Sequence, residues 1–149
     1  MFKLSTSAFE PEGRIPRKYT GEGVDVSPAL SWSGAPKGTV EFALICDDPD
    51  APRKDPWVHW VLYKIPADRT SLAEGSADSA VEGKNDFGRN GYNGPMPPPG
   101  HGVHHYHFKL YALNQPLGIT KPGATKAEVL KAMQGHILGE AELIGTYER

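Results

Sequence analysis

Histidine, the side chain best suited to acid–base chemistry and metal binding near neutral pH, is concentrated in one segment of the chain. Four of the six histidines lie between positions 101 and 107. Residues 103–113 have the alternating pattern of a β-strand, in which successive side chains point to opposite faces. The cluster would then be divided between two faces, and no cysteine or glutamate stands at ligand spacing beside it. We therefore predict no metal site.

The apolar residues of this strand decide which histidine points into the protein. Phe108, Leu110 and Ala112 share one face, so His104 and Tyr106 are expected to point inward with them. The outer face is expected to carry His105, His107 and Lys109. An inward imidazole and an inward phenol two positions apart place two hydrogen-bonding groups side by side. Two interpretations of His104 stay open: it could belong to a binding site, or it could be a core histidine that is hydrogen-bonded to a backbone carbonyl.

A second histidine, His59, lies in a stretch predicted to be a strand buried on both faces, residues 58–65. Strict alternation puts it on the face that also carries Trp57, Val61 and Tyr63. Leaving a buried imidazole unpaired costs about 1 to 3 kcal/mol, so we expect a partner, with Asp48 and Asp50 just upstream as the candidates. A carboxylate that contacts one histidine and lies near another favours the positively charged imidazolium form of the ring. A pocket with such a ring suits the binding of a small oxyanion.

The acidic segment 47–52 also raises the question of a calcium site. Pro49 and Pro52 break the flexible loop that an EF-hand needs, and the downstream glutamate is missing. The chain likewise has no Gly-x-Ser-x-Gly elbow, no Walker loop and no Gly-x-Gly-x-x-Gly fingerprint. We expect neither a nucleotide site nor a cofactor.

Short apolar runs between turn residues indicate the elements that position these side chains. Residues 39–46 are expected to form a strand covered on both faces, and residues 125–134 a short helix with Thr125 and Glu128 as a capping box. Residues 85–102, rich in glycine and proline, form a loop whose length is typical of a functional segment. The other strands are expected at 2–4, 29–32, 58–65, 103–113 and 141–147, with a connection at 68–81.

Composition limits the class of protein. We expect 149 residues to form one domain, and the 17 glycines and 14 prolines suit short strands joined by ordered turns. A net charge of −2 gives no electrostatic footprint for nucleic acid. The single cysteine, Cys46, cannot form an internal disulfide and fits a buried hydrophobe. No run has the length of a membrane span or signal peptide, so we expect a soluble cytoplasmic protein, monomeric or homodimeric.

Seven segments together carry a recognisable signature. They are IPRKYT at 15–20, SPALSW at 27–32, DPDAP at 48–52, WVHW at 57–60, GP at 94–95, GVHHY at 102–106 and EAELIGTY at 140–147. In this order and spacing they resemble the phosphatidylethanolamine-binding protein family, most closely its bacterial and archaeal Raf-kinase-inhibitor-like branch. The resemblance covers nearly the whole chain.

The resemblance implies an all-β sandwich of antiparallel strands in a Greek-key-like order, with one or two short peripheral helices. It also implies a small surface pocket for phosphate, acetate or a phosphoethanolamine head group. Carried over position by position, the pocket residues are Asp48, Pro52, Trp57, His59, Gly94, Pro95, His104 and Tyr106. His105 stands where animal and plant members usually carry arginine, a departure expected on the outward face. The chain stops at Arg149 without the C-terminal segment of animal members, so kinase regulation is not expected.

Two classes of function follow from these residues. The first, which we favour, is a binding module for a small oxyanion or phospholipid head group, with room for a protein partner. The second is a hydrolase or isomerase that uses His59 and His104 as acid and base on a small phosphorylated or carboxylated substrate. Binding is preferred because no activated nucleophile or cofactor motif accompanies the histidines.

Overall fold

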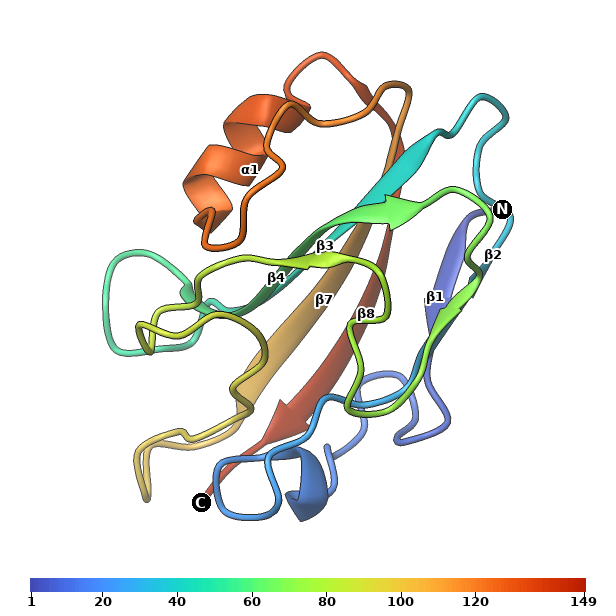
Figure 1. The fold of residues 1–149 in the computed structure, drawn as a ribbon. Coiled ribbons are helices and arrows are strands. Elements are labelled where there is room, and N and C mark those ends of the chain that lie inside the picture. The colour runs from blue at the N-terminus through green and yellow to red at the C-terminus, as the bar shows by residue number, and fades with distance from the viewer.

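The computed structural model covers residues 1–149, and its strands form two antiparallel sheets packed face to face (Figure 1). The larger sheet has the order β6-β4-β3-β7-β8 and the smaller one the order β1-β2-β5. This confirms the expected all-β sandwich. The elements are β1 (Lys3–Ser5), the 3₁₀ helix η1 (Arg17–Tyr19), β2 (Leu30–Ser33), β3 (Glu41–Asp48), β4 (Trp57–Pro66), β5 (Ser71–Leu72), β6 (Val81–Glu82), β7 (His104–Leu113), α1 (Lys126–Met133) and β8 (Ile137–Tyr147).

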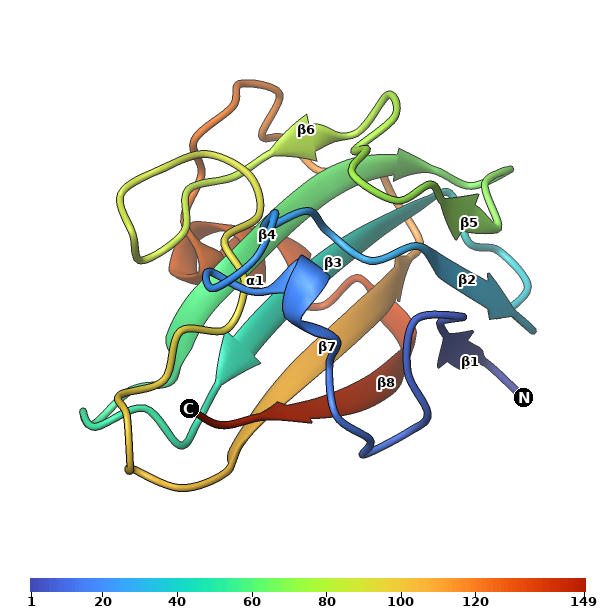
Figure 2. The ribbon, with the colours of Figure 1, turned by 90° about the horizontal axis from the view of Figure 1, so that it is seen from below.

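The larger sheet contains a Greek key. Strands β3, β4 and β6 follow one another across the sheet, and β7 then returns to pair with β3 on its free side. Numbered in chain order, these four strands lie as 4-1-2-3, which is the Greek-key arrangement. The return from β6 to β7 takes the glycine- and proline-rich loop across the end of the sheet where β3 ends and β7 begins (Figure 2).

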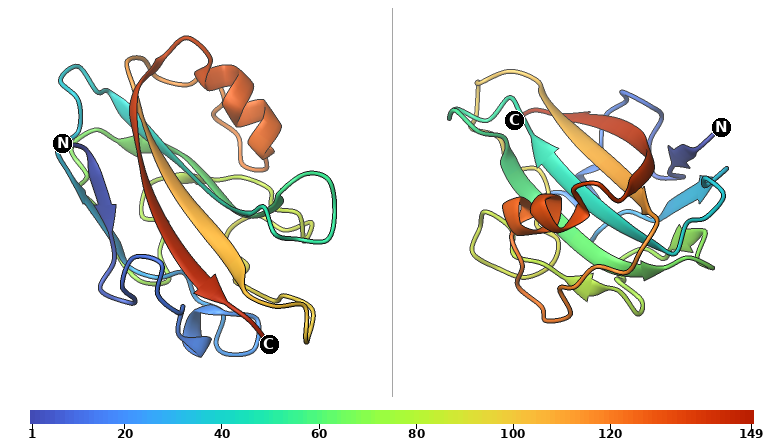
Figure 3. Two further views of the ribbon diagram at one scale, coloured as in Figure 1. Left: turned by 180° about the vertical axis from the view of Figure 1, so that it is seen from behind. Right: turned by 90° about the horizontal axis from the view of Figure 1, so that it is seen from above.

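Each face of the larger sheet is covered by a separate hydrophobic core, which explains why its central strands are apolar on both sides. The first core lies between the two sheets and joins Phe42, Leu44 and Cys46 of β3 to Leu30 and Trp32 of β2. The second lies beneath α1, which sits on the opposite side of the larger sheet from β1 and β2 (Figure 3). It contains, among others, Ala43, Ile45, Val61, Tyr63, Val129 and Met133.

Helix α1 begins as the sequence predicts. The Thr125 side chain accepts a hydrogen bond from the Glu128 backbone N–H, and the Glu128 side chain accepts one from the Thr125 backbone N–H, which completes the capping box. Lys126 Nζ reaches back to Asp47 Oδ2 of β3 at 2.6 Å, and so ties the helix to the sheet. No helix of this chain combines the length and apolar character needed to cross a bilayer.

The element boundaries differ from expectation where strand pairing outweighs local pattern. β8 begins at Ile137 rather than at residue 141, because its first residues pair with the end of β7, as in Leu113↔Ile137. β3 continues through Asp48, which pairs with Trp57. The expected connection 68–81 contains the two-residue strand β5, which extends the smaller sheet. Such short edge pairings carry too weak an alternation to be recognised from sequence.

The N-terminal segment 12–15 runs along the outer edge of β8. The Ile15 N–H donates to the Thr146 carbonyl at 2.7 Å, and the Thr146 N–H donates to the Gly13 carbonyl at 2.8 Å. Ile15 is completely buried against Gly145, where an added Cβ would lie 2.6 Å from its side chain. Only glycine at position 145 therefore allows this close approach.

Candidate anion-binding pocket

Three strand ends meet at one end of the larger sheet, because β3 is antiparallel to both β4 and β7. Asp48 ends β3, Trp57 begins β4 and His104 begins β7. The adjoining loops close over these ends and leave a pocket of about 230 Å³. Its lining comprises Asp48, Ala51, Pro52, Arg53, Trp57, His59, Phe87, Met96, Pro97, Pro98, His104 and Tyr106.

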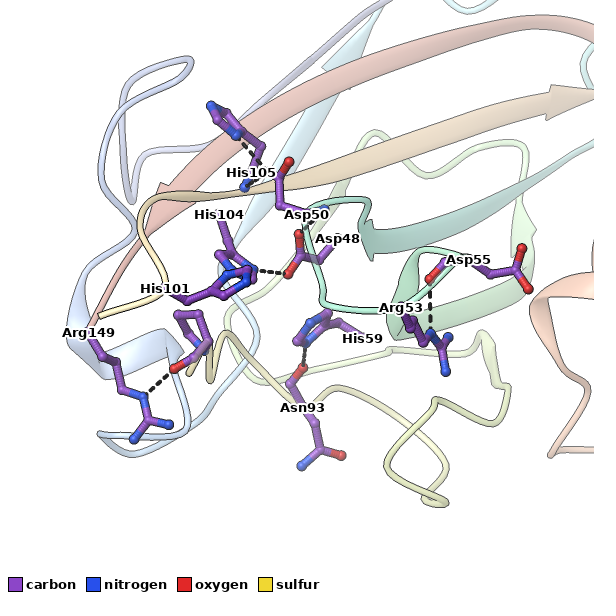
Figure 4. Close-up of polar contacts among 11 residues, drawn as sticks. Asp48, Asp50, Arg53, Asp55, His59, Asn93, His101, His104, His105 and Arg149 are labelled. Carbon is purple, nitrogen blue, oxygen red and sulfur yellow. Dashed lines mark hydrogen bonds and ion pairs between the residues drawn. The ribbon is translucent and has the colours of Figure 1, made fainter. Parts of the chain in front are cut away.

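A chain of hydrogen bonds runs from the buried floor of this pocket toward its mouth (Figure 4). His104 Nδ1 donates to Asp48 Oδ2 at 2.6 Å, and both side chains are almost completely buried. The other carboxylate oxygen accepts from the Asp50 backbone N–H at 2.8 Å, which fixes its orientation. His104 Nε2 lies 2.6 Å from Nδ1 of the exposed His101. Both nitrogens of His104 are therefore engaged.

The face assignment along β7 is as predicted. Tyr106 lies in the core between the sheets together with Phe108 and Leu110, and His104 is buried on the same side. His105 points away, with 45% of its side chain exposed, and contacts Asp50 Oδ2 at 2.8 Å. The four histidines of the cluster are thus divided between two faces. The structure brings no three His, Cys, Asp or Glu side chains together as a potential metal site.

The face assignment along β4 is wrong, because a β-bulge interrupts the alternation at His59. Trp60 pairs with Cys46 and Val58 pairs with Asp47, so His59 is an extra residue without a cross-strand partner. Val58 consequently joins Val61 and Tyr63 beneath α1, although alternation had placed it on the opposite face from them. His59 and Trp57 turn into the pocket, where the His59 ring lies 5.1 Å from the Tyr106 ring.

The partner of His59 also differs from expectation. Its Nδ1 donates to the Asn93 backbone carbonyl at 2.6 Å, and neither Asp48 nor Asp50 is bonded to it. Burial lowers the pKa of His59, and the Asn93 carbonyl and the charge of Asp48 only partly offset this effect. His59 is therefore a neutral imidazole at neutral pH, with Nε2 left for the pocket, rather than the imidazolium that the sequence suggested.

Two buried donors at the pocket have no hydrogen-bond partner in the protein. They are the Tyr106 hydroxyl and Trp57 Nε1. Burial, followed by the charge of Asp48, raises the pKa of Tyr106, so its hydroxyl keeps its proton. An unsatisfied buried polar group costs about 1 to 3 kcal/mol. Buried donors are rarely left without a partner in folded proteins, so these two groups call for an acceptor that the protein itself does not supply.

Arg53 is a pocket residue that the sequence analysis missed. Its guanidinium lies 4.5 Å from the centre of the Trp57 ring and contacts Asp86 Oδ2 at 2.5 Å. It also donates to the backbone carbonyls of Asp55 and Pro56. The sequence feature that could have identified Arg53 is its position directly after Pro52, in the rigid loop that follows β3. The sequence pattern likewise marks His101 only as a member of the histidine cluster.

Two of the eight expected pocket residues lie behind the lining rather than in it. Gly94 is buried, its N–H donates to Asp25 Oδ1 at 2.8 Å, and an added Cβ would lie 2.0 Å from the Tyr19 carbonyl oxygen. The carbonyl of Pro95 accepts from the Gly21 N–H at 2.9 Å. Both residues anchor the loop from behind. The structure brings together at the pocket Asp48, Pro52, Trp57, His59, His104 and Tyr106.

Comparison with known proteins gives consistent matches along the chain. A family model described as phosphatidylethanolamine-binding protein matches residues 5–148. A UPF0098 protein of Methanothermobacter thermautotrophicus is 53% identical over 152 residues, which covers 98% of each chain.

Two solved structures are similar over nearly their whole length. The phosphatidylethanolamine-binding protein (PEBP) homologue CT736 of Chlamydia trachomatis has a TM-score of 0.93 at 41% identity, covering 99% of this chain and 97% of its own. E. coli YbcL, described as a member of the mammalian PEBP family, has a TM-score of 0.94 at 33% identity, covering 99% and 98%.

Proposed function

Because the chain belongs to the phosphatidylethanolamine-binding protein family, we propose that its pocket binds a small oxyanion, such as phosphate, acetate or a phosphoethanolamine head group. The observation that carries this proposal is the pair of unpartnered buried donors, the Tyr106 hydroxyl and Trp57 Nε1. Both line the same pocket as the Asp48–His104 pair. A ligand oxygen placed between them would accept the hydrogen bonds that the protein leaves unmade.

The rest of the pocket suits a ligand of this kind. Its volume of about 230 Å³ admits a small molecule or a head group rather than a large cofactor. Most of its exposed lining is apolar and includes Phe87, which is 40% exposed, and Met96, which is 42% exposed. In this proposal a protein partner would contact the same rim, since exposed apolar groups around a site are typical of interaction surfaces. The proposed location is the cytoplasm.

The proposal is tested by calorimetric titration with phosphate, acetate and phosphoethanolamine. Tyr106→Phe removes one donor without changing the shape of the ring, and we expect affinity to fall about tenfold to a hundredfold. Tyr111→Phe, in the core on the other face of the sheet, is the matched control and should leave affinity unchanged. Absence of binding by the wild-type protein, or equal losses in the two variants, would contradict the proposal.

A second candidate function is acid–base catalysis on a small substrate in the same pocket. The observation that favours it is the Asp48–His104 contact, because a carboxylate that orients an imidazole is the arrangement of many general bases. No serine, threonine or cysteine lines the pocket, so we expect no covalent intermediate on a side-chain hydroxyl of serine or threonine or on a thiol. Turnover of a phosphoester or carboxylic ester that disappears in His104→Ala, but not in His105→Ala, would establish this alternative.

A further inference from the structure

The charged side chains at the pocket are paired with charges of opposite sign. Arg53 contacts Asp86 Oδ2 at 2.5 Å, and Asp48 contacts His104 Nδ1 at 2.6 Å. The first pair contributes +1 and −1, and the second contributes −1 with either 0 or +1 from the imidazole. These four groups therefore sum to −1 or 0. Among the side chains that line the pocket, no cation is free of a neighbouring carboxylate.

The other polar groups that face the pocket are neutral. His59 donates to the Asn93 carbonyl from Nδ1, and its burial opposes a second proton on the ring. Tyr106 and Trp57 contribute an O–H and an N–H without net charge. The pocket thus offers hydrogen-bond donors to a ligand oxygen, but little net positive charge.

A second negative charge on the ligand would consequently be unfavourable. It would meet no unpaired cation, and it would share a partly apolar cavity with the buried Asp48 carboxylate. We propose that the pocket selects singly charged oxyanions, such as phosphodiesters and carboxylates, over dianions such as phosphate monoesters. This inference rests on the proposed function and specifies the ligand class of the same site.

The test compares two phosphate esters that differ in charge but little in size. Dimethyl phosphate is a monoanion, whereas methyl phosphate is mainly a dianion at about pH 8, well above a second pKa of about 6. Titration of the full chain at that pH should give an affinity for dimethyl phosphate at least about tenfold higher. Acetate, a second monoanion, should bind in the same range as the diester.

The outcomes separate the two proposals. Equal or tighter binding of methyl phosphate would overturn the charge selectivity while leaving the pocket an anion site. If neither ester nor acetate binds, the proposed function itself fails.

A charge variant tests the physical cause. Asp86→Asn removes the carboxylate beside Arg53 but keeps an oxygen that can accept from the Val58 N–H, now 2.7 Å from Asp86 Oδ2. Arg53 then becomes an uncompensated cation, and the affinity for methyl phosphate should rise more than that for dimethyl phosphate, by about threefold to tenfold. The control is Asp68→Asn, at an exposed residue in the turn after β4. It changes the net charge by the same amount and should not alter the ratio of the affinities for methyl phosphate and dimethyl phosphate. An unchanged ratio in Asp86→Asn would contradict the inference.

Discussion

Both ring nitrogens of His104 are committed within the protein, and this determines how a ligand can approach it. Nδ1 is held by the buried Asp48 carboxylate, while Nε2 is held by His101 from the exposed loop. Gly100 and Gly102 flank His101 with φ values of 73° and 100°, so the backbone there adopts a conformation that favours glycine. Of the two partners, His101 is the exposed one, so an anion that binds as proposed would displace this ring rather than Asp48.

Removing the His101 ring should therefore strengthen binding. We expect His101→Ala to raise the affinity for acetate about twofold to tenfold, because the ligand no longer replaces an existing hydrogen bond. Calorimetric titration measures the change. His107→Ala, on the outer face beside Glu142, is the control. A weaker affinity in His101→Ala would mean that this ring contacts the ligand instead of competing with it.

Neighbouring histidines on β7 should behave differently. His104→Ala removes a buried donor to a charged ligand, and we expect the affinity for phosphate to fall by about 1.5 to 3 kcal/mol. His105→Ala removes a half-exposed contact with Asp50, so affinity should hardly change and stability should fall by less than about 0.5 kcal/mol. Parallel titrations and urea unfolding distinguish the two. Equal losses of affinity in the two variants would contradict the assignment of His104 and His105 to opposite faces of β7.

His59 should make stability depend on pH. Its pKa is lowered in the folded chain by burial, so the unfolded chain binds more protons below about pH 6.5. The stability is fully present above about pH 6.5, the pKa of the unfolded chain, and is lost as pH falls from about 6.5 toward the lower pKa of the folded chain. His59→Gln should lose less stability than wild type between about pH 7.5 and 5.5 in urea unfolding. His136→Gln, distant from the pocket, should retain the wild-type dependence.

At the scale of single elements, the sequence predicts strands and helix well but misses the bulge that forms the pocket. The apolar alternation in β7 correctly placed His104 and Tyr106, since the pairing of β7 with β8 runs without a register shift from His104 to Ala112. In β4 nothing in the local sequence marks His59 as the extra residue, because a bulge arises from pairing with β3. Alternation alone would have turned His59 toward the helix side of the sheet.

The ion pair between Lys126 and Asp47 links α1 to β3. Lys126 and Asp47 form a largely buried ion pair, so Lys126→Met would leave the Asp47 carboxylate without its partner. We expect the free energy of unfolding to fall by about 3 kcal/mol, the lower range for breaking such a pair. Urea unfolding tests this, with the exposed Lys131→Met on the same helix as control. Adding Asp47→Leu should recover most of the loss.

At the scale of the whole molecule, the pocket is a product of topology. The antiparallel pairing of β3 with β4 brings Asp48 and His59 to one end of the sheet, and the Greek-key return of β7 brings His104 to the same end. Their residue types suggested a shared site, but periodicity could not supply the strand order, which the family resemblance implied. The approach of Arg53 and His101 depends on loop conformations that no sequence pattern specified.

Ligand binding should consequently stabilise the molecule as a unit. The assembled pocket exists only in the folded chain, so a bound anion shifts the folding equilibrium by mass action. At about a hundred times its Kd, acetate should raise the free energy of unfolding by about 2.7 kcal/mol. Thermal unfolding with and without acetate measures this effect, and His104→Ala should lose it. A rise in Tm that is equal in wild type and variant would indicate a nonspecific salt effect.

The packing of Ile15 against Gly145 has a consequence for the order of events during synthesis. The N-terminal segment leaves the ribosome first, yet the edge on which it docks belongs to β8, the last strand of the chain. A nascent chain cannot pack Ile15 against Gly145 until 130 further residues have been translated, which at about 5 to 20 residues per second takes roughly 7 to 26 seconds. Translation, rather than chain collapse, therefore sets the earliest moment at which this sandwich can close.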